Sequence, residues 1–197
     1  TMKRTNSIFR SGFGLTAAAV AAMVGLAPSL ASAVCSDGST LPADLPVDPD
    51  LRWACWVALA AQDAASPTEL DAALARDDTM TGRRAHLLAV ASRPGTAARE
   101  ATWLRATTDE SVTNDQLRAL VRGFAQPADP PAPGYADRYF ASLTGWWAGR
   151  TQTMATILAR GFFPSGSLDA GERPEQHPIV RQARAWLRDH ADAPHAL

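Results

Sequence analysis

The sequence predicts an all-α fold built from antiparallel helical hairpins. Three observations support this: apolar residues recur at helical spacing along the chain, no segment shows convincing alternation over strand length, and the turns are short. Helices of roughly 10 to 15 residues joined by short turns pack as hairpins, and a series of hairpins forms either a bundle or a curved superhelical array. The 197 residues, 46% of them apolar, suffice for one domain with a hydrophobic core.

Capping signals predict the first three helices. Asp48 followed by Pro49 predicts a helix start, because aspartate caps helices and proline fits the first turn. Residues 66–69 (SPTE) combine a serine cap with a glutamate at the capping-box position, so a second helix starts there. A third helix begins near Thr79 and ends before Pro94.

The remaining helices follow from the same signals. A fourth runs from Ala97 to about Ala106, and a capping box at residues 113–116 opens a fifth that prolines end from Pro127 on. Residues 135–164 hold two amphipathic helices, and a last one runs from about His177 to His190. The aromatic residues of 135–164 fit a core between packed helices better than a ligand-binding aromatic pocket.

The first 33 residues are typical of a secretory signal peptide. A basic start precedes the short apolar run of residues 15–26, and Ala31-Ser32-Ala33 resembles a cleavage site. A retained membrane anchor is less favoured because the run is short and alanine-rich. We therefore expect a secreted or extracytoplasmic protein with no stable membrane span after cleavage, in which residues 34–48 form a linker.

Export makes the two cysteines relevant. Cys35 and Cys55 would close a modest loop through a disulfide in an oxidising compartment. Cys55 also fits a helix as a small apolar residue, so a free thiol at Cys55 remains the alternative to the disulfide. Neither cysteine has a neighbouring histidine or a CxxC spacing, which disfavours redox catalysis and zinc binding.

No catalytic or metal site is predicted. The chain lacks HExxH, a GxSxG elbow and glycine-rich phosphate loops. His190, Asp192 and His195 are a disfavoured metal set, since they lie at an expected frayed end. A formal charge of −1 gives no electrostatic reason to expect nucleic acid.

Arginines are the remaining candidates for ligand contact. Arg138, Arg150 and Arg160 flank the aromatic helices, and Arg181, Arg184 and Arg188 recur along one face of the last helix. Of these, Arg138, Arg150 and Arg184 are the residues expected to face a ligand. On a concave surface such guanidinium groups suit the terminal carboxylate of a peptide. A solvated face paired with acidic side chains is the favoured alternative.

The stretch from Tyr135 to Pro164 (YADRYFASLTGWWAGRTQTMATILARGFFP) resembles the C-terminal helical domain of aminopeptidase N-type zinc metallopeptidases, the gluzincin family, of actinobacterial type. Residues 48–56, 73–82, 114–124 and 177–197 carry weaker similarity in the same order, so the resemblance covers roughly residues 41–197. It implies that residues 49–197 form a HEAT-like superhelical array, expected to be incomplete at its C-terminus.

The resemblance also implies a function. Enzymes of this family remove N-terminal amino acids from peptides with zinc held by another domain, and the helical domain shapes the chamber. We therefore expect a non-catalytic portion, inactive alone and without a cofactor of its own, whose partner is a peptide or the missing catalytic domain, with Arg150 facing the chamber. The alternative is a stand-alone secreted helical-repeat module that binds a peptide or protein.

Overall fold

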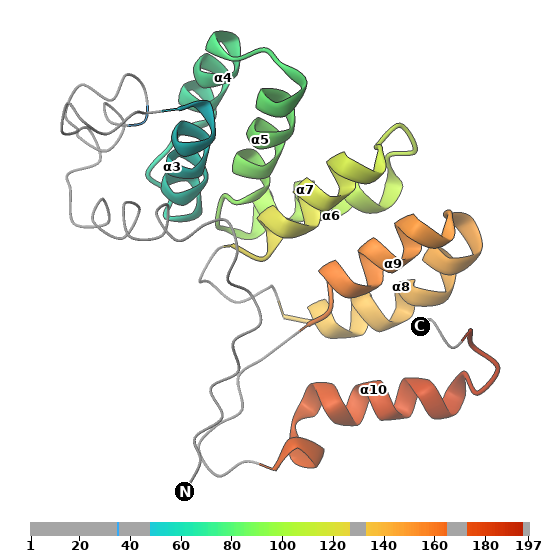
Figure 1. The fold of residues 1–197 in the computed structure, drawn as a ribbon. Coiled ribbons are helices and arrows are strands. Elements are labelled where there is room, and N and C mark those ends of the chain that lie inside the picture. Colours follow the sequence, from blue (N-terminus) through green and yellow to red (C-terminus); the bar gives the residue numbers. More distant parts are fainter. Residues whose placement is uncertain (1–34, 36–47, 127–132, 165–172, 195–197) are drawn as a thin grey trace, which may run out of the picture.

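The computed structural model describes residues 35, 48–126, 133–164 and 173–194, and every regular element in these residues is a helix (Figure 1). The all-α prediction is therefore confirmed. The predicted signal peptide and nearly all of the predicted linker lie outside the described residues. The elements are α3 (Pro49–Ala61), α4 (Pro67–Arg76), α5 (Met80–Ala91), α6 (Thr96–Thr108), α7 (Asn114–Phe124), α8 (Tyr135–Gly149), α9 (Gln152–Gly161), the 3-10 helix η1 (Pro174–Gln176) and α10 (Pro178–Asp189).

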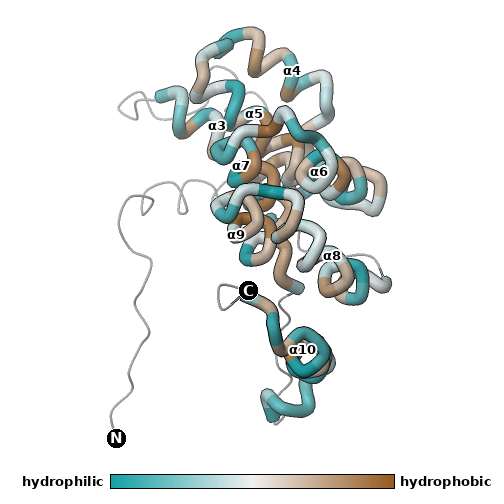
Figure 2. The backbone as a smooth tube through the Cα atoms, turned by 90° about the vertical axis from the view of Figure 1, so that its right-hand side faces the viewer, coloured by the Kyte–Doolittle hydropathy of each residue, from teal (hydrophilic) through white to brown (hydrophobic). Residues whose placement is uncertain are grey.

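The helices form two layers. Each of α4, α6 and α8 packs against the odd-numbered helix that follows it, which gives three hairpins in succession. The odd-numbered helices α3, α5, α7 and α9 also pack on one another in sequence, whereas the even-numbered helices do so much less. Figure 2 shows α3, α7 and α9 on one side of the array and α4, α6 and α8 on the other. The odd-numbered helices thus pack more closely on one another than the even-numbered helices do, as expected for the inner layer of a curved helical array.

The predicted caps explain why these helices begin where they do. The Asp48 carboxylate accepts a hydrogen bond of 2.7 Å from the Leu51 amide at the start of α3. Capping boxes are present at Ser66 for α4 and at Thr113 for α7, as the sequence predicts. Each such cap satisfies an otherwise unpaired amide and is worth about 1 kcal/mol.

Two boundaries differ from the sequence prediction. Helix α6 ends at Thr108 rather than near Ala106, and the hydroxyl groups of Thr107 and Thr108 donate to carbonyls one turn back at 2.9 and 2.7 Å. These bonds let two threonines, which are modest helix formers, extend the last turn. The last helix starts at Pro178 because His177 serves as its N-cap.

Buried side chains fall into two clusters that share α5. The first lies among α3, α4 and α5 and includes the disulfide between Cys35 and Cys55, whose Cα atoms are 5.6 Å apart. The second is larger and joins α5 to α10. Leu87 and Ala91 of α5 belong to the second cluster and Ala89 to the first, so α5 connects the two halves.

None of the described helices has the length and apolar content needed to cross a membrane.

Candidate functional site

Aromatic rings fill the junction of the second and third hairpins. Trp103 of α6 lies 4.8 Å from Phe162 and 5.4 Å from Tyr135 between ring centroids, and Phe124 of α7 lies 4.9 Å from Phe162. Trp146 of α8 contacts the same group at 5.5 Å from Trp103. All except Tyr135 are buried. Most aromatic residues of 135–164 therefore serve as core, which agrees with the interpretation favoured by the sequence, whereas Phe163 is 45% exposed.

Both tyrosines of the chain use their hydroxyl groups to bind the end of α9. Tyr135 donates to the Phe162 carbonyl at 2.5 Å and Tyr139 to the Ala159 carbonyl at 2.6 Å. These carbonyls belong to the last turn, where helical partners run out. Burial disfavours the phenolate and raises the pKa of Tyr139 to about 12 and the pKa of Tyr135 further still.

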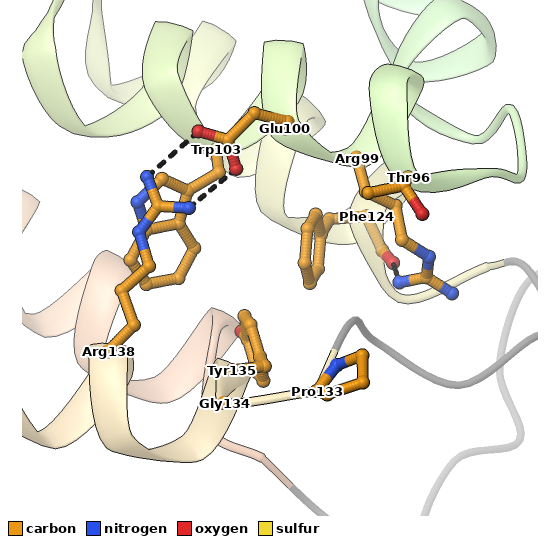
Figure 3. Close-up of a pocket in the computed structure, with 9 residues that line it drawn as sticks. All are labelled: Thr96, Arg99, Glu100, Trp103, Phe124, Pro133, Gly134, Tyr135 and Arg138. Carbon is orange, nitrogen blue, oxygen red and sulfur yellow. Dashed lines mark hydrogen bonds and ion pairs between the residues drawn. The ribbon is translucent and has the colours of Figure 1, made fainter.

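A small pocket opens beside this cluster, between α6, the end of α7 and the start of α8 (Figure 3). On one side the Arg138 guanidinium makes a bidentate ion pair with the Glu100 carboxylate, with N–O distances of 2.5 and 3.1 Å. The same guanidinium lies 4.7 Å from the centroid of a Trp103 ring. The lining residues are Thr96, Arg99, Glu100, Trp103, Phe124, Pro133, Gly134, Tyr135 and Arg138.

The Glu100–Arg138 pair has a clear electrostatic effect. Hydrogen bonding to the guanidinium lowers the pKa of Glu100 below its ordinary value of 4.5. Both side chains are more than 40% exposed, so water screens the pair and its contribution to stability is modest. The pair, with the guanidinium stacked on Trp103, fixes α8 against α6.

Arg99 lines the other side of the pocket and is only 7% exposed. Its Nη1 donates to the Phe124 carbonyl at 3.0 Å, and its guanidinium lies 5.1 Å from the Phe124 ring centroid. Arg99 therefore satisfies the last turn of α7 and stacks on its terminal aromatic ring.

The size of the pocket limits what it can hold. Its volume is about 100 Å³, whereas ligand pockets usually span about 300–1,000 Å³. At most it suits one side chain of a neighbouring chain. Arg138, a candidate from the sequence, thus lies at the rim of a small pocket and already has a partner.

Arg150, the second candidate, follows the last residue of α8. Its Nη2 donates to the Thr107 carbonyl at 2.8 Å and its Nη1 to the Asp109 carbonyl at 3.3 Å. A cation at the carboxyl end of α6 satisfies free carbonyls and complements the helix dipole. Arg150 therefore has a structural role in this chain, and its predicted position facing a chamber stays a prediction.

Arg184, the third candidate, is exposed on α10 and forms no hydrogen bond or ion pair with another described residue. The three candidates do not converge. Arg138 and Arg150 lie at opposite ends of α8, about 18 Å apart along the helix axis at the usual rise per residue. Arg184 lies on a different helix.

Among the described residues, no group of three His, Cys, Asp or Glu side chains is arranged to hold a metal ion. The His190 ring stacks on Trp186 with centroids 4.3 Å apart, and its Nδ1 lies 2.9 Å from the Trp186 carbonyl. His195, of the disfavoured metal set, lies outside the described residues.

The sequence matches the family model of the ERAP1-like C-terminal domain over residues 12–196. The chain belongs to this family. It is also 34% identical to an aminopeptidase N of Streptomyces lividans over 155 residues, which are 77% of this chain and 18% of that protein. The resemblance predicted from the sequence is confirmed: the chain is a C-terminal domain of an aminopeptidase N-like protein. This ERAP1-like domain spans about a fifth of the relative it matches.

The match begins inside the predicted signal peptide of residues 1–33. Residues 12–33 therefore belong both to the predicted leader and to the matched part of the ERAP1-like domain. The leader stays a prediction.

Sequence reasoning missed Arg99. Its position four residues before Trp103 places both side chains on the inward face of α6, which also carries Ala106. An arginine on the apolar, inward face of a predicted helix indicates a buried guanidinium group. Such a buried group needs a hydrogen-bond acceptor, and a free carbonyl at a helix end is the expected one.

Proposed function

We propose that this chain is the non-catalytic C-terminal portion of an aminopeptidase N-like enzyme and that its odd-numbered layer faces the peptide chamber. The supporting observation is the continuous packing of α3, α5, α7 and α9, because the more closely packed layer of a curved helical array is its inner one. The parent activity is the removal of N-terminal amino acids from peptides, with zinc held in the catalytic part of the enzyme rather than in this chain.

The distribution of charge supports this orientation. Helices α5, α7 and α9 carry five arginines and one aspartate, whereas α4, α6 and α8 carry four arginines and four acidic residues. A positive inner layer attracts the carboxylates of peptides and repels their amino ends. It would thus favour peptides that enter with the amino end directed away from this domain and toward the zinc.

The proposed partners are peptides and the catalytic part of the enzyme. We also propose that the protein is secreted or extracytoplasmic, on the strength of the basic, apolar and small-residue pattern in residues 1–33. The disulfide between Cys35 and Cys55 agrees with an oxidising compartment.

The test uses the purified chain, alone and with an aminopeptidase N from which the matched segment has been deleted. Alone, the chain should neither hydrolyse aminoacyl-arylamides nor bind zinc stoichiometrically. Added to the deleted enzyme, it should increase cleavage of peptides more than cleavage of arylamides, because only peptides reach its inner layer. Hydrolysis by the chain alone would contradict the proposal. Capture of a specific extracellular protein, without any effect on the deleted enzyme, would favour the stand-alone binding module instead.

A further inference from the structure

An open groove runs between α7 and α9, which lie side by side in both views (Figures 1 and 2). Its volume is about 610 Å³, and it is open to solvent rather than enclosed. We call it the α7–α9 groove. It belongs to the odd-numbered layer. Arg138, Arg150 and Arg184 do not line it, whereas Arg160, which the sequence also places beside the aromatic helices, does.

The floor of the α7–α9 groove is apolar and held in place by close packing. Val121 of α7 and Ile157 of α9 line it. Beside them, α9 approaches α7 so closely at Gly161 that a Cβ atom there would lie 2.5 Å from the Val121 Cβ. Because α9 and α7 are already in contact at this point, α9 cannot move closer to α7 and close the groove.

The walls of the groove carry positive charge from both helices. Arg118 lies on α7 and Arg160 on α9, and none of the described residues that line the groove is acidic. The Arg160 side chain is exposed and forms no hydrogen bond or ion pair with another described residue. Arg118 contacts Asp115 at 3.3 Å, but both side chains are more than half exposed, and such pairs are weak enough to exchange for a ligand.

Hydroxyl groups complete the lining. Thr153 and Thr156 of α9 lie along the groove, and Thr156 donates to the Gln152 carbonyl at 2.8 Å. Guanidinium groups pair with carboxylates through two parallel hydrogen bonds, and neighbouring hydroxyl groups add donors or acceptors for a peptide backbone. An inorganic anion would fill only a small part of the volume, and an apolar floor gives it nothing to contact.

We propose that the α7–α9 groove binds an extended acidic peptide segment, whose side-chain carboxylates pair with Arg118 and Arg160 while its apolar groups lie on Val121 and Ile157. The excess of arginine on α5, α7 and α9 adds a long-range attraction of the same sign. The proposal concerns this chain alone and does not depend on the proposed peptidase context.

The test measures the binding of a fluorescein-labelled peptide to the full chain by fluorescence anisotropy. The peptide contains several glutamates alternating with apolar residues, and both ends are blocked so that only side-chain carboxylates can pair. Its counterpart with glutamine in place of glutamate should bind at least tenfold more weakly. Arg160→Gln and Arg118→Gln should each weaken binding of the acidic peptide by about two- to fivefold, as expected for the loss of one solvent-exposed ion pair.

Arg84→Gln is the matched control, because Arg84 is also exposed on an odd-numbered helix but does not line the groove. This variant removes one distant charge and should weaken binding of the acidic peptide far less than either groove variant does. Thermal melts of all variants serve as the check that each variant keeps the fold. The proposal is overturned if the acidic peptide does not bind, if Arg84→Gln weakens binding as much as Arg160→Gln does, or if inorganic phosphate at equal concentration displaces the peptide.

Discussion

Gly123 of α7 lies directly against Ala91 of α5, and a Cβ atom at position 123 would be 2.6 Å from the Ala91 Cβ and 2.7 Å from the Leu88 carbonyl oxygen. This contact lets the two odd-numbered helices pack at short distance. Backbone atoms are among the obstacles, so no side-chain rotation relieves the clash. The absence of a side chain at position 123 is thus a condition for the odd-numbered layer.

The Gly123→Ala variant should therefore be destabilised by about 2 kcal/mol, because the helices must separate to admit one methyl group. The same change at Gly145 of α8 is the control, since nothing lies within 4 Å of a Cβ there and alanine favours helix formation by up to about 1 kcal/mol. Urea unfolding of both variants measures the effect. Equal stability of the two variants would contradict the packing described for α5 and α7.

Arg150 offers a second prediction. Replacing it by glutamine removes the hydrogen bonds to Thr107 and Asp109, and we expect a loss of about 1 to 2 kcal/mol in the free energy of unfolding. Arg184→Gln removes an exposed arginine that has no described partner and should change stability by less than about 0.5 kcal/mol. Thermal unfolding followed by circular dichroism compares the two. A loss in Arg184→Gln as large as in Arg150→Gln would speak against the cap on α6.

The Glu100–Arg138 pair predicts a specific dependence on pH. Because the pKa of Glu100 is lower in the folded chain than its ordinary value of 4.5, the pair stabilises the fold above pH 4.5 and loses this effect as the pH falls through the folded pKa. Glu100→Gln should cost between about 0.2 and 1 kcal/mol at pH 7, since the pair is exposed. Denaturant unfolding at a series of pH values should show this difference shrinking toward zero under acid conditions. A difference that stays constant down to pH 3 would exclude the pair as its source.

The tyrosines allow a spectroscopic prediction. The chain contains two tyrosines, both with raised pKa values, so absorbance at 295 nm should show little tyrosinate near pH 10, where a free tyrosine is half ionised. The neutral hydroxyl groups stabilise the fold below pH 10, and this contribution is lost as the pH rises through the folded pKa values. Unfolded chain in urea is the control and should titrate near pH 10. Titration of either tyrosine at pH 10 in the folded chain would contradict the burial of its hydroxyl group.

The sequence was enough for the helices and most of their ends, because these depend on neighbouring residues. Local signals predicted these features, namely the caps and the helical spacing of apolar residues. The structure contains the predicted caps at Asp48, Ser66 and Thr113. The end of α6 was predicted near Ala106 and lies at Thr108, because Thr107 and Thr108 form hydrogen bonds within the helix that equally suit a turn.

Features that depend on a distant helix could not be predicted in the same way. The requirement for glycine at position 123 arises from a contact with α5, and the role of Arg150 from carbonyls more than 40 residues earlier in the chain. The α7–α9 groove likewise joins Arg118 to Arg160 only after the helices have packed. Spacing along one helix carries no signal for any of these.

The central claim is that the odd-numbered layer faces a peptide chamber, and a chimera in which this chain replaces the matched segment of the Streptomyces lividans aminopeptidase N tests it most directly. Arg160→Glu changes the charge of the inner layer, and Arg105→Glu makes the same change on α6 of the outer layer. The account predicts that Arg160→Glu lowers kcat/KM for acidic peptides several-fold and leaves cleavage of a short arylamide unchanged. Arg105→Glu should change the cleavage of neither substrate. Equal effects of the two variants on acidic peptides, or an effect of Arg105→Glu alone, would contradict it.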